Sequence, residues 1–322
     1  MRLRIPCAMA AAIVASIGLS TAVHASILGV AADFNGFVFG NLSSAGADTE
    51  GRLAVGGNFT ASSYAVGSGG VGPALPNSHG TRNDLIVGGT MNAIGGWQVF
   101  YGNAVYGTSL TAAPTTPNGS TFQGTPIDFA AAQADLTAKS QYWSTLSTNA
   151  SVVYDGYSTL TLTATNAGLN VFNVSEAIWE ATSNKHIVNP FPNATLLINV
   201  AGVNVTQAGG LSYNGTQTPS AAHSGVLFNY AEALTLQSNH IGILGSVLAP
   251  FADLTLNGGG INGNGIANNV LQQNGGEFHN FVFTGDLPNV ISTPEPSSAV
   301  IAGALCVGGA LVGRRRLIGA PQ

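Results

Sequence analysis

Charged side chains and cysteines are the residues that this chain has least of. Asp, Glu, Lys and Arg make up 7% of its 322 residues, and its two cysteines, Cys7 and Cys306, lie near the ends. Disulfides therefore cannot hold the central part together. Intrinsic disorder is excluded as well, because disordered chains combine high charge with few aliphatic residues, whereas this sequence is 45% hydrophobic. The central part must fold through apolar burial and backbone pairing.

Basic residues are especially rare in the central part. Five of the nine lysines and arginines lie at the two ends of the chain. The basic residues between the ends, which are set against nearly all of the fourteen acidic ones, are Arg52, Arg82, Lys139 and Lys185. A nucleic-acid partner is excluded, because phosphate neutralisation needs clustered lysine and arginine. A lyase-like, polysaccharide-active enzyme on a β-helix stays open as an alternative, although it would need a basic residue beside its carboxylates.

Sequence motifs of catalysis and metal binding are missing too. The chain has no HExxH, CxxC or GxSxG, and the histidines of its central part are scattered. We therefore predict that the protein is not an enzyme and holds no cofactor. Calcium is the alternative, since Asp48, Glu50 and Asp84 could form one acidic loop site with the oxygen ligands that this ion prefers.

The first 25 residues have the three-part layout of a secretory signal peptide. Arg2 and Arg4 give the positive start, an apolar stretch of about 13 residues comes next, and Val23-His24-Ala25 fits a small-x-small cleavage site. The apolar stretch is shorter than the roughly 20 residues that a membrane span needs. We predict cleavage after Ala25 and export of the remaining chain.

Residues 292–322 carry a second targeting pattern. Pro294-Glu295-Pro296 comes first, the uncharged stretch 299–313 is next, and Arg314, Arg315 and Arg316 come last. As a helix the uncharged stretch would be about 22 Å long, shorter than a hydrocarbon core of roughly 30 Å. The arginines would stay on the cytoplasmic side. The segment therefore fits a helix that contacts the membrane transiently.

This tail resembles the PEP-CTERM sorting signal, which occurs on exported proteins of bacteria that make exopolysaccharide. The resemblance implies that an exosortase, a membrane enzyme, cuts near Pro294-Glu295-Pro296 and either releases the protein or re-attaches it. The expected destination is the cell surface, outer membrane or extracellular matrix of a Gram-negative bacterium.

Short apolar segments recur along the central part at nearly constant spacing. Residues 243–249 match 261–267 at a spacing of 18, 233–236 match 253–256 at a spacing of 20, and Val87 matches Val105 at 18. Coils of about 18–20 residues with glycine corners are typical of an all-β solenoid, or β-helix. An ordinary β-sandwich is the alternative, because its strands also alternate and end in turns.

One segment departs from the strand pattern. Residues 126–146 place an apolar stripe at helical spacing, after a candidate cap, Thr125, and a proline suited to the first turn. We predict one helix here, lying against the solenoid. Beyond it, 159–165 alternate threonine with aliphatic residues, and 193–206 contain two strands separated by Ala201-Gly202.

A second resemblance covers nearly all of the exported part. Residues 48–58 (DTEGRLAVGGN), the run 245–267 and the closing GEFH at 276–279 resemble the choice-of-anchor A domain. The resemblance implies one adhesive domain, residues 26–291, with the ice-binding-like adhesin fold: a β-solenoid with a flanking helix. Members of that family carry varied C-terminal anchors, PEP-CTERM among them, and no catalytic residues come with it.

These observations favour an exported, non-enzymatic adhesin of the surface or biofilm matrix. We expect ladders of Thr, Ser and Asn to bind an exopolysaccharide or another cell-surface ligand, with aromatic residues such as Tyr64, Trp97, Tyr101 and Tyr106. Ice binding is a further alternative that the threonine strand at 159–165 suggests, although ice recognition would need such rows on neighbouring coils.

Overall fold

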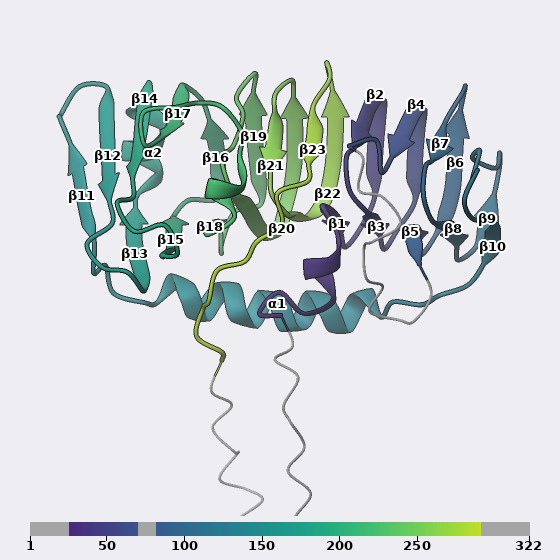
Figure 1. The fold of residues 1–322 in the computed structure, drawn as a ribbon, viewed down its shortest axis with the longest axis horizontal. Helices are drawn as coiled ribbons and strands as arrows, with labels where there is room; N and C mark the ends of the chain where they lie inside the picture. Colours follow the sequence, from purple (N-terminus) through teal and green to yellow (C-terminus); the bar gives the residue numbers. More distant parts are fainter. Residues whose placement is uncertain (1–25, 70–81, 291–322) are drawn as a thin grey trace, which may run out of the picture.

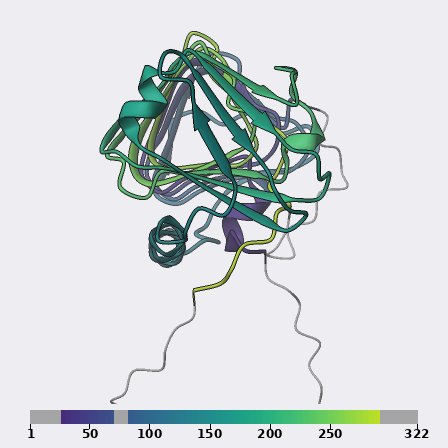
Figure 2. The ribbon, with the colours of Figure 1, turned by 90° about the vertical axis from the view of Figure 1, so that its left-hand side faces the viewer.

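A computed structural model describes residues 26–69 and 82–290. They form a β-solenoid of triangular cross-section, with one long helix, α1 (Phe129–Ser144), running alongside it (Figure 1, Figure 2). The predicted all-β solenoid with a flanking helix is confirmed. Both predicted targeting segments, 1–25 and 292–322, lie outside the described residues. Within the described ranges, no helix is long and apolar enough to cross a membrane.

The wall of the triangle that α1 covers runs the whole length of the solenoid, and we call it the helix-side wall. Its strands pair in parallel. In order along the solenoid they are β13 (Leu169–Val174), β15 (Thr195–Val200), β18 (Val226–Asn229), the first parts of β20 (Ser246–Asn257) and β22 (Gly265–Gln273), β1 (Gly36–Val38), β3 (Leu53–Val55), β5 (Asn83–Val87), β8 (Asn103–Tyr106) and β10 (Thr121–Gln123).

The second wall, which we call the Asn/Thr wall, is also one continuous parallel stack. Its strands are β16 (Asn204–Gln207), β19 (Thr235–Asn239), the second parts of β20 and β22, the first parts of β2 (Leu42–Thr49) and β4 (Phe59–Val66), β6 (Thr90–Ile94) and β9 (Ser109–Leu110).

The third wall is discontinuous. One sheet contains β11 (Ser151–Tyr154), β12 (Thr159–Thr163), β14 (Asn184–Val188) and β17 (Gly210–Tyr213), with β11 antiparallel to β12. The rest of the wall consists of β21 (Gly260–Asn262), β23 (Glu277–His279), the ends of β2 and β4, and β7 (Gln98–Val99). A short helix, α2 (Glu176–Ala181), and two 3-10 turns, Gly29–Asp33 and Ala221–His223, complete the described elements.

The described chain begins and finishes in the middle of the solenoid. Strands β1–β10 build one half, α1 runs back along the full length, and β11–β23 build the other half (Figure 1). The halves meet where β22 pairs with β1 and β2, and β23 pairs with β2; we call this junction the seam. Glu277 and His279 belong to β23, so they lie at this seam in the middle of the solenoid and not at one of its ends.

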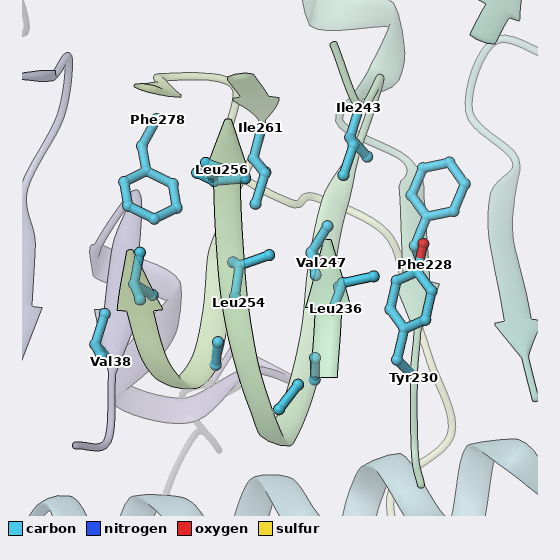
Figure 3. Close-up of a cluster of buried hydrophobic side chains, with 14 of the residues drawn as sticks. Val38, Phe228, Tyr230, Leu236, Ile243, Val247, Leu254, Leu256, Ile261 and Phe278 are labelled. Atoms are coloured by element: carbon cyan, nitrogen blue, oxygen red, sulfur yellow. The ribbon is translucent and has the colours of Figure 1, made fainter. Parts of the chain in front are cut away.

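The hydrophobic core has two compartments, one on each side of the helix-side wall. Inward residues such as Phe228, Leu254 and Phe278 fill the interior of the solenoid (Figure 3). Outward residues of the helix-side wall, such as Ile86 and Leu227, pack with α1. Every residue of β5 and β15 is therefore buried, which explains why each strand contains an apolar run, 85–87 and 196–198, that does not alternate with polar residues.

Helix α1 confirms the helix predicted at 126–146, with a different cap. Asp128, not Thr125, is the N-cap: its carboxylate accepts a hydrogen bond from the Ala131 N–H at 2.9 Å. Asp is as good an N-cap as Thr, and the extended residue before the helix leaves Pro126 outside it. Leu136 and Trp143 are buried as the apolar stripe predicts.

The pairing registers confirm one predicted repeat and correct two. Ile243 bridges Ile261, so the spacing of 18 is right there. Thr235 pairs with Asp253 at 18 rather than 20. A slip of two residues keeps the same side chains inward, so the sequence alone could not show it. Val87 pairs with Tyr106 at a spacing of 19, not with Val105 at 18. Both faces of this wall are apolar, so hydrophobicity does not mark the register in the sequence.

Glycines occupy one corner because the coils approach each other closely there. A Cβ on Gly88 would lie 2.3 Å from the Gly56 carbonyl oxygen, and one on Gly107 would lie 1.9 Å from that of Gly88. Gly56, Gly88 and Gly107 directly follow β3, β5 and β8. Close approach, rather than a positive φ, requires glycine at this corner.

The corner between the Asn/Thr wall and the third wall instead uses left-handed backbone. In-register residues of successive coils there have φ between 52° and 87°. The column contains Gly209 (74°), His240 (56°), Gly258 (69°), Asn274 (52°), Gly46 (80°), Ser63 (52°) and Gly95 (87°). Gly and Asn adopt this conformation most readily, which accounts for the Asn-Gly tracts of the sequence.

Candidate functional site

Of the three walls, the Asn/Thr wall is the one that is both continuous and uncovered. Helix α1 packs on the helix-side wall, and the third wall is interrupted between β17 and β21. On the Asn/Thr wall, buried and accessible residues alternate, as in β4, whose inward residues Phe59 and Ala61 are buried while Thr60 and Ser62 are exposed. This alternation leaves one face of every strand available to a ligand.

The outward residues of the Asn/Thr wall form columns along the solenoid, because the strands pair in register. One column contains Asn204, Thr235, Asp253, Asn269, Asn41, Asn58, Thr90 and Ser109. The next contains Thr206, Gln237, Thr255, Leu271, Ser43, Thr60, Asn92 and Thr111. Neighbours within a column are about 4.8 Å apart, the spacing of paired strands.

Hydrogen bonds between coils hold these polar side chains in place. The side-chain oxygen of Asn269 accepts from the Asn41 N–H at 2.7 Å, that of Asn41 from the Asn58 N–H at 2.8 Å, and that of Asn58 from the Thr90 N–H at 2.9 Å. The Thr90 and Ser109 hydroxyls are 3.0 Å apart. The wall therefore presents an ordered grid of amides and hydroxyls, which lowers the entropic cost of binding.

The grid is almost free of charge. Asp253 is the one ionisable residue in the two columns, and it accepts a hydrogen bond from Asn269 at 2.7 Å. A shallow groove crosses the seam here, lined by Ser43, Thr255 and the half-exposed Leu271 among others. Amides and hydroxyls around one apolar side chain suit a neutral, repetitive ligand that makes many weak contacts.

The threonine strand expected from the sequence lies elsewhere. Thr159–Thr163 is β12, at one end of the third wall, and its outward residue Thr161 has Val153 and His186 as neighbours. The threonine row is therefore not repeated there. The repeated rows lie on the Asn/Thr wall, where asparagine, serine and threonine replace one another from coil to coil. These rows can be recognised in the sequence only after the strands are aligned by their pairing register.

The aromatic residues expected to contact a ligand do not belong to the Asn/Thr wall grid. Tyr64 is 2% exposed and Trp97 is 5% exposed, and both point into the core against Phe59. Burial also raises the pKa of Tyr64, whose hydroxyl lies 2.7 Å from that of Thr49. Tyr101 and Tyr106 are half-buried on the coils near β8. Tyr64 and Trp97 are thus core residues, not ligand contacts.

The three acids considered for calcium are placed in different surroundings. Asp84 is fully buried, with the carboxylate 3.1 Å from Arg82 and 3.8 Å from Arg52. Asp48 lies on the third wall beside Glu277, and Glu50 accepts a hydrogen bond from the Asn280 N–H. In residues 26–69 and 82–290, no group of three or more His, Cys, Asp or Glu side chains could hold a metal ion.

Acidic residues at the seam repel one another. Partial burial, and then the negative charge of Asp48, raise the pKa of Glu277, and Glu50 adds to the effect. His279 opposes it, with the ring Nε2 3.3 Å from the Glu277 carboxylate. The Glu277–His279 contact therefore lies at the seam.

Comparisons with known proteins identify the family of this chain. Residues 27–280 match the family model for an ice-binding-like adhesive domain. No curated protein matches the sequence. Similar solved structures include ice-binding proteins from the Antarctic ascomycete Antarctomyces psychrotrophicus (13% identity, TM-score 0.39, covering 78% of this chain and 96% of that one), from an Antarctic biological consortium (14%, 0.34, 80% and 90%) and, in glycosylated form, from an Arctic yeast (12%, 0.34, 83% and 97%).

Proposed function

Since the chain belongs to the family of ice-binding-like adhesive domains, we propose that it is an exported, non-enzymatic protein that adheres through its Asn/Thr wall. The observation that carries this proposal is the continuous, nearly uncharged grid of amides and hydroxyls on eight paired strands. A repetitive ligand can contact several coils at once, so that many weak contacts add up along the wall.

The ligand class that fits this grid best is a neutral, hydroxyl-rich polysaccharide, such as the exopolysaccharide of the producing cell. Sugar hydroxyls can exchange hydrogen bonds with Asn and Thr side chains, and the exposed Leu271 can contact an apolar sugar face. An anionic polymer fits less well, because Asp253 is the one charge in the grid and lysine and arginine are absent from it.

The test is co-sedimentation of the purified exported chain with insoluble neutral exopolysaccharide. The double substitution Ser43→Asp and Thr60→Asp places two charges in the centre of the grid, and we expect it to reduce binding at least about ten-fold, because each carboxylate must be desolvated. Thr161→Asp, on the third wall, is the matched control and should bind normally. Equal binding by the double variant would refute the Asn/Thr wall as the adhesive surface.

Ice is a second candidate ligand, favoured by the regular spacing of the columns. An ordered two-dimensional set of hydroxyls and amides could order water against it. Freezing-point depression without a matching melting-point change, lost in the Ser43→Asp and Thr60→Asp variant, would identify ice as the ligand. A chain that binds polysaccharide and leaves ice growth unchanged would exclude it.

We also propose how the protein reaches the surface: cleavage after Ala25, then sorting by an exosortase-type enzyme that recognises Pro294-Glu295-Pro296 and Arg314–Arg316. This route rests on the resemblance of the tail to PEP-CTERM signals and of the domain to choice-of-anchor A proteins. The mature N- and C-termini can be determined by mass spectrometry of protein recovered from a producing cell. Replacing all three arginines with glutamine should prevent C-terminal processing; unchanged processing would disprove this route.

A further inference from the structure

A cavity of about 450 Å³ lies away from the Asn/Thr wall grid, between the C-terminal half of α1 and the ends of β13, β15 and β18. Figure 1 shows these three strands reaching α1 near one end of the solenoid. The volume is within the range of small-molecule sites, about 300–1,000 Å³. None of the sequence motifs indicates a site here.

Three asparagines in register form the back of this cavity. Asn173, Asn199 and Asn229 pair on successive strands, with the amide of Asn229 donating to the Asn199 oxygen at 2.9 Å and that of Asn199 donating to the Asn173 oxygen at 2.8 Å. The same amides also donate to carbonyl oxygens of the helix and its C-terminal turn. The ladder is thereby fixed: Asn199 and Asn229 use both of their amide hydrogens, so they keep only oxygen lone pairs, whereas Asn173 keeps one N–H beside its oxygen.

The rim and the end of α1 add more acceptors. Glu232 uses one carboxylate oxygen to accept from the Gly202 N–H at 3.0 Å, which leaves the other for a ligand. The C-terminal end of a helix carries partial negative charge. A ligand that offers several O–H donors matches this set, whereas an anion would be repelled by Glu232.

Ala201, which is exposed, and the half-buried Ala231 form a small apolar strip beside these polar groups. Val174 and Val200 also line the cavity, but their side chains are buried in the interior of the solenoid. A single carboxylate is too little to hold a metal ion, since divalent cations take several oxygen ligands with charge. Polar acceptors beside an apolar strip match a pyranose ring, which has hydroxyls at its edge and C–H groups on its faces.

We propose that this cavity is a binding site for a neutral pyranose, either a free monosaccharide or the terminal unit of a glycan chain. It is a second, end-on site, separate from the extended contact that the Asn/Thr wall makes. Asn173, Asn199 and Glu232 accept hydrogen bonds from the sugar hydroxyls, and Ala201 contacts the ring.

The experiment is saturation-transfer NMR with titration, on the full exported chain, using methyl glucoside, galactoside, mannoside and glucuronide as probes. We expect at least one neutral glycoside to bind, and the glucuronide to bind at least about ten-fold more weakly because of its repulsion by Glu232. Ala201→Trp should abolish binding, since Ala201 is exposed and the indole would fill the cavity without entering the core. Glu232→Gln, which keeps an oxygen for Gly202, should weaken binding several-fold.

The controls separate this site from the adhesive wall. The Ser43→Asp and Thr60→Asp variant should bind the glycoside normally, whatever its effect on polysaccharide adhesion. Thermal unfolding of Ala201→Trp establishes that it is folded, and Glu232→Gln provides an independent result if it is not. Binding by none of the neutral glycosides, equal binding of the glucuronide, or loss of binding in the wall variant would each overturn the proposal.

Discussion

At the scale of single residues, two kinds of glycine hold the coils together for different physical reasons. Gly88 is required because a Cβ would meet a backbone carbonyl of the neighbouring coil, which cannot move without unpairing a strand. Gly46 has open space around its Cβ position and is required only by its φ of 80°. Glycine corners could be predicted from the sequence, but the distinction between the two reasons depends on the distance between coils.

Substitution by alanine should separate these two roles. We expect Gly88→Ala to lower the free energy of unfolding by about 3 kcal/mol or more, because overpacking against backbone cannot be relieved by a rotamer change. Gly46→Ala should cost only about 1–2 kcal/mol, the penalty for left-handed backbone in an L-residue. Urea unfolding of both variants measures the difference; equal losses would contradict the assignment.

Lys185 gives the protein an unusual dependence of stability on pH. Its ammonium nitrogen is buried, donates to the Thr182 and Ala208 carbonyls at 2.8 Å each, and lies 5.0 Å from the Trp179 ring centre. Burial lowers the pKa of Lys185 to about 8, and Glu180 opposes the shift in part. Between that pH and the ordinary value of 10.5, the unfolded chain binds a proton that the folded chain does not.

Stability should therefore rise with pH from about 8 towards 10. Above about pH 10 it should fall, because burial raises the pKa of Tyr64 and Tyr230, so that the unfolded chain loses phenolic protons first. Urea unfolding at half-unit pH intervals tests this profile. Lys185→Met should remove the rising part and keep the fall; a rise that persists in the variant would show that another group causes it.

At the scale of elements, the sequence predicts whether a segment is a helix or a strand better than it predicts which strands pair. The helix, the alternation of β12 and the strand pair β15–β16 can be predicted from local hydrophobic periodicity, which is a property of each segment alone. The Asn/Thr wall could not be predicted in the same way, because its columns depend on registers between segments. The asparagine ladder of β13, β15 and β18 was missed for a related reason: its members are separated by 26 and 30 residues, outside the 18–20 period.

Helix α1 should contribute strongly to stability through Trp143. This side chain is fully buried, and its indole N–H donates to the Pro288 carbonyl at 2.8 Å, so it fixes the C-terminal segment as well as the helix. We expect Trp143→Ala to cost about 3–5 kcal/mol in the free energy of unfolding. The neighbouring Tyr142→Ala should cost much less, because Tyr142 is half-buried. Similar losses in thermal unfolding would mean that α1 is held mainly by other contacts.

At the scale of the whole molecule, the seam joins two halves of the chain that are far apart in sequence. Its strands pair residues more than 200 positions apart, as when Phe37 pairs with Ile266. Such pairing has a large entropic cost of closure and is expected to form late in folding.

The seam should be strong enough to join separate pieces. We expect residues 26–124 and 125–290, co-expressed as two chains, to purify as one complex, because both sides of the seam bury apolar residues in a common core. Gly265→Val should prevent this, since its Cβ would lie 2.2 Å from the Phe278 ring. Failure of the unmodified pieces to associate would show that α1 continuity, rather than the seam, maintains the fold.

Both ends of the described chain lie at the middle of the solenoid, on the side where α1 lies (Figure 1). A tether at either end would therefore hold the solenoid at mid-length, from its helix-side wall. The Asn/Thr wall would then extend equally on both sides of the attachment. Coils inserted at either end of the solenoid would lengthen the Asn/Thr wall without moving the point of attachment.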